Sequence, residues 1–252
     1  MIKVIINADD FGINDVVTRE IERMIESGSI SSTTIMANGS CLEEVKRYVP
    51  LHPEISFGVH LCLSEFSSLT KSPIFSKYGL IDENGIFKHK AIFRINHFNA
   101  QLLDAIKEEL SAQIDVVRYL GITISHADSH HHVHTIYPLK DVFAEVLKEQ
   151  RIQRIRRGSE FNSLRMKLHL LQWRKRTLLN NFYSKEFNTA SLFSSYSGFI
   201  KQHPLLKDNS IIELMCHPGH PERIYTSEIK LVQMDTLSKV TNFQLISYND
   251  IQ

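Results

Sequence analysis

Histidine is concentrated in one short stretch of the chain. Five of the 13 histidines fall between His126 and His134, interspersed with Ala, Asp, Ser and Val. Alternate side chains of an extended strand share a face. The residues that would share one face here are His126, Asp128, His130 and His132, while His131 would point away. Because packing alone has no use for so many imidazoles, the stretch predicts a metal site.

Two adjacent carboxylates, Asp9 and Asp10, follow an apolar run at the start of the chain, in the sequence Asn7-Ala-Asp-Asp-Phe-Gly12. Successive side chains diverge, so one carboxylate can ligate a cation while the other acts beside it as a proton acceptor. Acidic residues are also common near helix starts, and Asn14 is a candidate helix cap. An acidic pair at a helix N-terminus is therefore the alternative interpretation.

Two further histidines lie in apolar surroundings. His60 lies in Gly58-Val-His-Leu-Cys-Leu63, and by itself it is more typical of a packed core residue than of a ligand. His217 ends an apolar run in Glu213-Leu-Met-Cys-His-Pro-Gly-His220, where Pro-Gly predicts a turn. A histidine in such a turn suits general acid catalysis.

The pattern of apolar runs predicts alternating strands and helices. Strands are expected at 4–6, 33–36, 55–63, 122–124, 152–155, 211–216 and 244–247. Helices are expected between Asn14 and Gly28 and at 42–48, 100–120, 139–150 and 227–240. This alternation is typical of a mainly parallel sheet with right-handed crossovers.

Polar residues end most of the predicted strands, which favours an α/β fold of the (β/α) barrel, TIM-barrel-like kind, because barrels carry their sites at the carboxyl ends of the strands. The residues at these ends are Asp9, Asp10, Asn38, His60, Asp128, His130 and His217. An open doubly wound sheet is the alternative, although no Gly-rich dinucleotide fingerprint follows the first strand. We expect a single domain over 1–252, with a substrate-covering insertion at about 64–99.

Composition excludes several classes of protein. Lys and Arg total 29 against 28 Asp and Glu, so the chain lacks the basic field of a nucleic-acid binder, and we expect a substrate that is not strongly charged. Three scattered cysteines do not form a disulfide framework. The first apolar run is too short for a signal peptide or a membrane span, so we expect a cytoplasmic protein without a membrane partner.

The segment 151–185 holds ten basic residues and one acid, Glu160. Its leucines at 164, 168, 171 and 178 could form a helix face. A solvated helix that packs on the barrel or on a second copy is favoured over a membrane-surface helix. We expect a homodimer.

Taken in order, four motifs resemble the signature of the YdjC-like carbohydrate deacetylases, a family that includes chito-oligosaccharide deacetylases. They are the stretches 7–12, 58–60, 128–134 and 213–219, and Ser32-Thr-Thr on the second strand adds to the match. The resemblance implies a barrel related to that of polysaccharide deacetylases and one divalent ion, Mg²⁺ in the first place. By position in the motifs, the ligands would be Asp10, His60 and His130. Zn, Mn, Co and Fe accept the same nitrogen and oxygen ligands.

The chemistry implied is the hydrolysis of an acetamide on an amino sugar such as a chito-oligosaccharide. Asp9 would take a proton from the attacking water, the ion would stabilise the oxyanion, and His217 would protonate the departing amine. Asp128 would orient a histidine. His132 and His134 would either bind substrate or fix His130, and the sequence leaves both roles open.

Three rival functions remain at this stage. Two histidines and a carboxylate also form the facial triad of non-haem iron oxygenases, which would leave Asp9 and His217 without a role. A barrel phosphoesterase would normally need more than one metal. A non-catalytic sugar-binding or metal-storage protein could retain the fold, since fold alone does not fix function.

Overall fold

A computed structural model gives the fold of residues 1–158, 170–195, 198–200, 206–220 and 242–251. Its centre is one curled sheet in which every strand pairing is parallel. The strands are β1 (Ile2–Phe11), β2 (Ser32–Ile35), β3 (Ser56–Leu61), β4 (Ala127–Ser129), β5 (Leu192–Ser195), β6 (Ile211–Cys216) and β7 (Phe243–Leu245). Their order is β4-β3-β2-β1-β6-β5, and β7 pairs with the start of β1.

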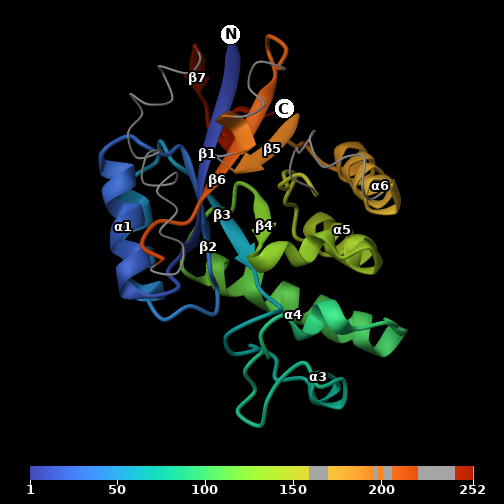
Figure 1. The fold of residues 1–252 in the computed structure, drawn as a ribbon. Helices are drawn as coiled ribbons and strands as arrows, with labels where there is room; N and C mark the ends of the chain where they lie inside the picture. The colour runs from blue at the N-terminus through green and yellow to red at the C-terminus, as the bar shows by residue number, and fades with distance from the viewer. Residues whose placement is uncertain (159–169, 196–197, 201–205, 221–241, 252) are drawn as a thin grey trace.

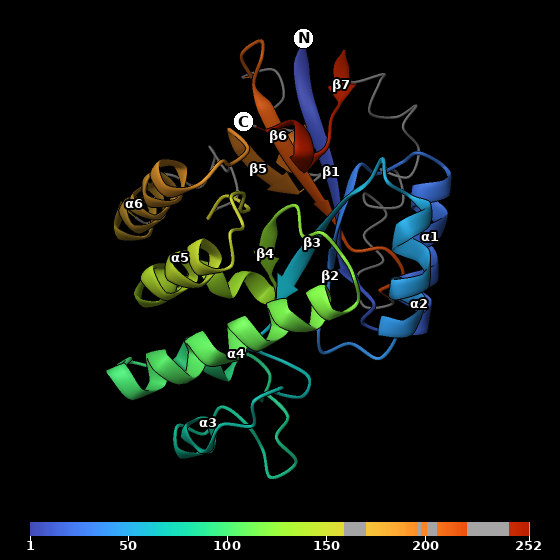
Figure 2. The same cartoon turned by 180° about the vertical axis from the view of Figure 1, so that it is seen from behind.

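Helices cover the outside of this sheet on two sides (Figures 1 and 2). They are α1 (Asp15–Glu26), α2 (Leu42–Tyr48), α3 (Pro73–Lys77), α4 (Ala100–Tyr119), α5 (Lys140–Glu149) and α6 (Leu170–Glu186). Helices α1 and α2 lie on one flank, while α4, α5 and α6 lie on the other, and α3 lies beyond α4. None of the helices in the described part of the chain is long and apolar enough to cross a bilayer.

Local sequence signals account for several element boundaries. Helix α1 begins after Asn14, whose side chain accepts a hydrogen bond from the Val17 backbone N–H at 2.9 Å, and Asn99 caps α4 in the same way through Leu102. The predicted helix 42–48 and strand 211–216 are confirmed at both ends. Since these elements carry both an apolar pattern and a clear stop, their bounds could be predicted well.

The expectation of an α/β fold is confirmed, but the closed TIM-like barrel is not. The sheet curls into a half-barrel, and among the described residues β4 and β5 are its edges. The predicted strand 152–155 makes only isolated bridges, from Ile155 to Ala127 and from Arg154 to Asn188. The segment 152–155 therefore adds single bridges beside β4 and does not close the ring. The single domain over 1–252, with its insertion at about 64–99, remains a prediction.

The structure differs from the predicted elements at three places in the chain. The strand predicted at 122–124 is wrong, because the chain pairs with β3 only at β4, which begins at Ala127. Strand β5 was not predicted. Among the α6 side chains that the structure describes, 174–186, Leu179 and Tyr183 are buried, whereas Leu178, expected on the apolar face, is exposed. The other three leucines of that predicted face are not among the described side chains. The helix expected at 227–240 lies outside the described residues.

The base of the curled sheet is filled by an aromatic stack. The Tyr248 ring lies 3.7 Å from the His126 ring and nearly parallel to it, at 9°. Gly58 leaves the room for this imidazole, since a Cβ there would lie 2.6 Å from His126 Cε1. His126 also faces Asn7 Oδ1 through Nε2 at 3.0 Å. This histidine thus packs inside the sheet, and the three cysteines are buried free thiols as expected.

Candidate active site

The two adjacent carboxylates sit in a bulge of β1. The register between β1 and β2 shifts between Ala8 and Phe11, which is where Asp9 and Asp10 lie. Asp10 has φ of 73°, in the left-handed region that non-glycine residues rarely adopt. A bulge of this kind re-aims side chains that a regular strand would send to opposite faces. Both carboxylates are accordingly buried at the same end of the sheet.

Asp10 lies beside the two histidines that were predicted to share a metal ion with it. Its Oδ1 lies 3.1 Å from His60 Nε2 and 2.8 Å from His130 Nδ1. All three side chains are almost fully buried. Asp10 Oδ2 makes no hydrogen bond, and His220 Nε2 lies 3.0 Å from it. The structure thus brings together Asp10, His60 and His130, and it adds His220 at their edge.

The orientation of His60 follows from strand register. His60 on β3 lies opposite Asp128 on β4, and its Nδ1 is 2.6 Å from Asp128 Oδ1. That contact leaves Nε2 to face Asp10. Burial opposes a charge on His60, but Asp128 and then Asp10 outweigh it and raise its pKa well above the ordinary value. Thr34 donates a further hydrogen bond to Asp128 Oδ2 at 3.2 Å.

A buried arginine ties the carboxylates together. Arg156 donates from Nη1 and Nη2 to the two oxygens of Asp9 at 2.7 and 2.6 Å, and from Nε to Glu213 at 2.8 Å. Its Nη1 also lies 2.7 Å from Asp128 Oδ2. The Phe193 ring covers the guanidinium at 4.9 Å. A fork of donors with fixed geometry suits this role, which a lysine could not fill.

Asp9 lies between Arg156 and His217. Its Oδ2 is 3.6 Å from His217 Nε2, and Asn7 donates to its Oδ1 at 2.9 Å. Burial alone would raise the Asp9 pKa, but the charge and hydrogen bonds of Arg156 lower it well below the usual range. Asp9 is therefore held ionised next to the histidine that the sequence proposed as the acid.

The histidine stretch does not continue as a strand. β4 ends at Ser129, and both His131 and His132 have left-handed φ values, of 52° and 56°. The expected alternation of faces is therefore wrong beyond β4: His130 reaches Asp10, His131 contacts Ser64, and His132 turns towards Phe193 at 5.6 Å between rings. His126 points to the interior stack described above. A tight turn, which period-two reasoning does not detect, separates these roles.

His134 lies on the far side of this turn, away from Asp10. Its backbone N–H donates to Ser129 Oγ at 3.0 Å, its Nδ1 contacts the same hydroxyl, and its ring packs near Tyr183 and Phe143. Burial and then the charge of Arg156 lower its pKa to about 3, which keeps it neutral. Its contacts close the loop that begins directly at His130.

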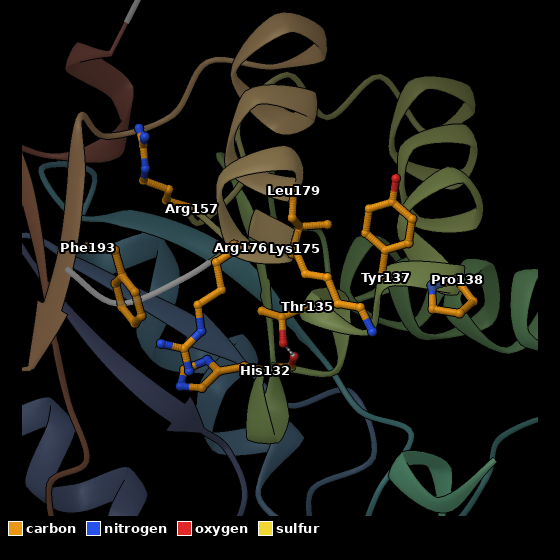
Figure 3. A pocket seen from close by; sticks show the side chains of 10 residues that line it. His132, Thr135, Tyr137, Pro138, Arg157, Lys175, Arg176, Leu179 and Phe193 are labelled. Atoms are coloured by element: carbon orange, nitrogen blue, oxygen red, sulfur yellow. Dashed lines mark hydrogen bonds between the residues drawn. The ribbon is translucent and has the colours of Figure 1, made fainter. Parts of the chain in front are cut away.

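A cavity of about 370 Å³ borders Phe193, whose ring also covers the Arg156 guanidinium. Its lining includes His132, Tyr137, Arg157, Lys175, Arg176 and Phe193. Figure 3 shows Arg176 and Lys175 reaching down from α6 over the turn that carries His132 and Thr135. The cavity therefore joins the buried network to the cationic side chains of α6, part of the basic segment noted in the sequence.

The donor set of Asp10, His60 and His130 fits a divalent ion. Metal–ligand bonds of about 2.0–2.2 Å place neighbouring ligand atoms about 3 Å apart, as the contacts of Asp10 Oδ1 with both imidazoles do. The pairing of His60 Nδ1 with Asp128 is the arrangement that orients ligating imidazoles. The second oxygen of the Asp10 carboxylate, Oδ2, is buried and is a further ligand atom available to the ion.

Charge balance supports the same interpretation. The site holds the buried carboxylates of Asp9, Asp10 and Asp128, while the Arg156 guanidinium contacts Asp9, Asp128 and Glu213 but not Asp10 among the described contacts. A divalent ion would neutralise the remaining negative charge in place of protons on His60 and His130, whose pKa values are raised in its absence. A second candidate group, Asp9, His60 and Asp128, is a poor cation site because Arg156 already contacts both of its carboxylates.

Sequence reasoning assigned no role to three residues of this site, Arg156, Glu65 and His220, the last of which lies three residues after His217. Arg156 lies directly after the predicted strand 152–155, so the rule applied to other strand ends would have found it, but the basic surroundings concealed it. Glu65 contacts His130 Nε2 through Oε2 at 3.1 Å. It lies in the segment 64–99 that carries no periodic pattern, and we find no sequence signal for it.

Comparison with known proteins places this site in a family. The family model described as YdjC-like protein matches residues 3–245. A protein of Vibrio parahaemolyticus named carbohydrate deacetylase is 30% identical over 222 residues, which cover 88% of this chain and 80% of that protein. A Clostridium beijerinckii protein of the same name is 26% identical, covering 98% and 94% of the two chains.

One solved structure has the same fold over nearly the whole length. It is an Enterococcus faecalis V583 protein, provisionally named a cellobiose-phosphate cleavage protein, with a TM-score of 0.74 and 23% sequence identity. The alignment covers 98% of this chain and 97% of that one.

Proposed function

Because this chain belongs to the YdjC-like protein family, we propose that it is a carbohydrate deacetylase that hydrolyses an N-acetyl group of an amino sugar with the help of one divalent ion. The observation that carries this proposal is the buried group of Asp10, His60 and His130 with Asp9 and His217 beside it. An ion site needs no separate carboxylate and histidine next to it, whereas a hydrolase does.

Asp10, His60 and His130 would hold the ion. When bound, the ion supplies a Lewis acid for the acetamide oxygen and lowers the pKa of water. Mg²⁺ is our first choice, as the family resemblance implies. His220, whose Nε2 lies 3.0 Å from Asp10 Oδ2, would keep that carboxylate in place.

Asp9 would accept the proton of the attacking water. Its pKa is far below the usual range, so it is a weak base that serves only when the water is itself acidified. His217, 3.6 Å from Asp9, would then donate a proton to the amine as the bond to the acetyl carbon breaks. The pair thus moves one proton from the nucleophile to the leaving group.

Other residues would act by positioning. Arg156 fixes both oxygens of Asp9, and Asp128 fixes the His60 ring. His134 would hold the turn that presents His130, through its contacts with Ser129. His132 would contact substrate, because it lines the cavity next to Phe193.

The rival functions make fewer demands on these residues. An iron oxygenase or a sugar-binding protein would need neither Asp9 beside His217 nor the arginine that keeps Asp9 ionised. A phosphoesterase would want cations facing the reacting group, yet the cations that line the cavity are not among the described contacts of Asp10, His60 and His130. Acetate release without oxygen consumption or phosphate release would separate deacetylation from all three.

The test is acetate release from chito-oligosaccharides by the wild type with and without chelator. We expect turnover that a chelator abolishes and that added Mg²⁺ or another divalent ion restores. His217→Ala should lower kcat by about 100-fold or more at unchanged metal content. Turnover that is insensitive to chelation would contradict the proposal.

The substrate panel should include phosphorylated as well as neutral oligosaccharides. The provisional name of the Enterococcus faecalis protein refers to a phosphorylated disaccharide, and Lys175 and Arg176 line the cavity of this chain. Arg176→Gln tests the contribution of the cavity, with Arg174→Gln as the matched control because Arg174 is exposed on the same helix outside the lining. We propose a chito-oligosaccharide as the parent sugar in either case.

A further inference from the structure

A second group of metal-ligating side chains lies at the opening of the segment 64–99. Glu65, His89 and His131 each offer one ligand atom, and these atoms lie within 4.8 Å of one another. We call these three residues the rim group. Glu65 follows β3 closely, His131 follows His130, and His89 comes from the middle of the segment. Three parts of the sequence therefore converge on one carboxylate.

The contacts within the rim group centre on Glu65. Its Oε1 contacts His89 Nδ1 and lies 4.0 Å from His131 Nε2. The two imidazole rings meet edge to face, with centroids 5.2 Å apart. His89 is 61% exposed, so its ring can turn without disturbing the core.

The backbone conformation of His131 and its contact with a hydroxyl orient the ring towards the Glu65 carboxylate. His131 has a left-handed φ of 52°, a conformation that costs energy in a residue other than glycine and that clusters at ligand sites. Its Nδ1 lies 2.9 Å from Ser64 Oγ, which leaves Nε2 for Glu65 and for a ligand. A partner on one ring nitrogen is how proteins orient imidazole ligands.

We propose that Glu65, His89 and His131 form a second, solvent-facing site for a divalent cation of the class that prefers imidazole, such as Zn²⁺, Co²⁺ or Ni²⁺. Two imidazoles and one carboxylate supply three ligands and leave the remaining positions to water or to a group of the substrate. The site is distinct from the buried one, since no side chain is a ligand in both.

Glu65 nevertheless connects the two sites. Its Oε2 is 3.1 Å from His130 Nε2, while its Oε1 faces the rim group. A change at Glu65 would therefore affect both ions. Within the described part of the chain, the polar and ring contacts of His89 are with Glu65 and His131, so its removal should affect the rim group and spare the buried one.

The experiment counts Zn²⁺ ions on the full chain, by equilibrium dialysis at fixed free Zn²⁺ followed by elemental analysis. His89→Gln should bind one ion fewer than the wild type. The matched control is His97→Gln, because His97 is an exposed histidine of the same segment that lies outside the rim group. His131→Asn is a second variant, since asparagine tolerates the left-handed backbone.

Equal Zn²⁺ counts for the wild type, His89→Gln and His131→Asn would overturn the second site. Loss of one ion in His97→Gln as well would also overturn it, because the effect would not be specific. The count requires no turnover, so it stands apart from the proposed deacetylation: Asp10→Asn should lose the buried ion and keep the one that His89→Gln removes.

Discussion

The buried group of Asp10, His60 and His130 and the rim group of Glu65, His89 and His131 have the same composition but opposite surroundings. The former is almost fully buried, whereas in the latter His89 is exposed and Glu65 and His131 are half-buried. Burial makes an unpaired charge costly, so the inner group is enclosed by Arg156, Asp128 and Thr34. The rim group is supported by Ser64, which contacts His131, and by His130, which contacts Glu65. Substitutions inside should therefore cost stability as well as activity, and those at the rim should cost binding alone.

The largest effect is expected from Arg156→Met. Removal of the guanidinium leaves Asp9, Asp128 and Glu213 as buried acids without their partner. We expect the free energy of unfolding to fall by about 3–5 kcal/mol, together with loss of activity. Chemical denaturation measures it, with Arg174→Met on the exposed face of α6 as the control. Equal unfolding free energies for the two variants would show that the buried network around Arg156 contributes no more to stability than the surface does.

A smaller, pH-dependent effect is expected at Glu213. Burial raises its pKa to about 7 although Arg156 and Tyr248 oppose the shift. The folded protein therefore keeps this proton at pH values where the unfolded chain, in which the glutamate pKa is 4.5, has lost it. The contribution of Glu213 to stability is thus full below about pH 4.5 and is lost as the pH rises towards 7.

Glu213→Gln should remove this slope. In glutamine the amide oxygen can still accept from Arg156 Nε, and the amide N–H can donate to the Tyr248 hydroxyl, so the fold is preserved. Between pH 5 and 8, we expect the unfolding free energy of the wild type to fall by roughly 1–3 kcal/mol relative to the variant. Parallel stability curves for the two proteins over this range would show that Glu213 is ionised throughout.

Glu65→Gln probes the connection between the two groups. Loss of the charge weakens the contact that orients His130, and outer partners of this kind affect metal affinity by about 10–100-fold. Because Glu65 is partly exposed, we expect the unfolding free energy to change by no more than about 0.5 kcal/mol. Chelator competition measures the first quantity and denaturation the second. Unchanged affinity would mean that His130 is held by Asp10 alone.

The smallest effect is expected from a surface ion pair. Arg19 and Asp15 lie 2.9 Å apart on α1, and both side chains are well exposed. Arg19→Ala should change the unfolding free energy by less than about 0.5 kcal/mol, because water screens the pair. A loss as large as that of Arg156→Met would contradict the dependence on burial.

Much of the fold could be predicted from the sequence, because apolar periodicity reports burial directly. Asn14 as a cap and the run 211–216 are examples in which one short signal determines a boundary. Closure of a barrel depends on long-range pairing instead. The segment 152–155 has the composition of a strand, yet it forms isolated bridges only.

The candidate site could be predicted from the sequence to about the same extent as the fold. Asp10, His60 and His130 could be proposed from residue type and motif, and the structure brings their ligand atoms together. Two backbone features of the site could not be predicted, because they depend on backbone angles that no side-chain pattern encodes. They are the bulge at Asp9 and Asp10 and the left-handed conformation of His131 and His132. Glu65 reaches His130 from an aperiodic segment, which only the folded chain reveals.

The most direct test of the central claim compares Asp9→Asn with Asp10→Asn, with both metal content and acetate release measured. We expect Asp9→Asn to keep the buried ion and to lose kcat by about 100-fold or more, because the proton acceptor is gone. We expect Asp10→Asn to lose the ion itself and with it all turnover. If Asp10→Asn retains the wild-type ion affinity, or if Asp9→Asn retains the wild-type rate, the assignment of ligand and base to these two carboxylates is wrong.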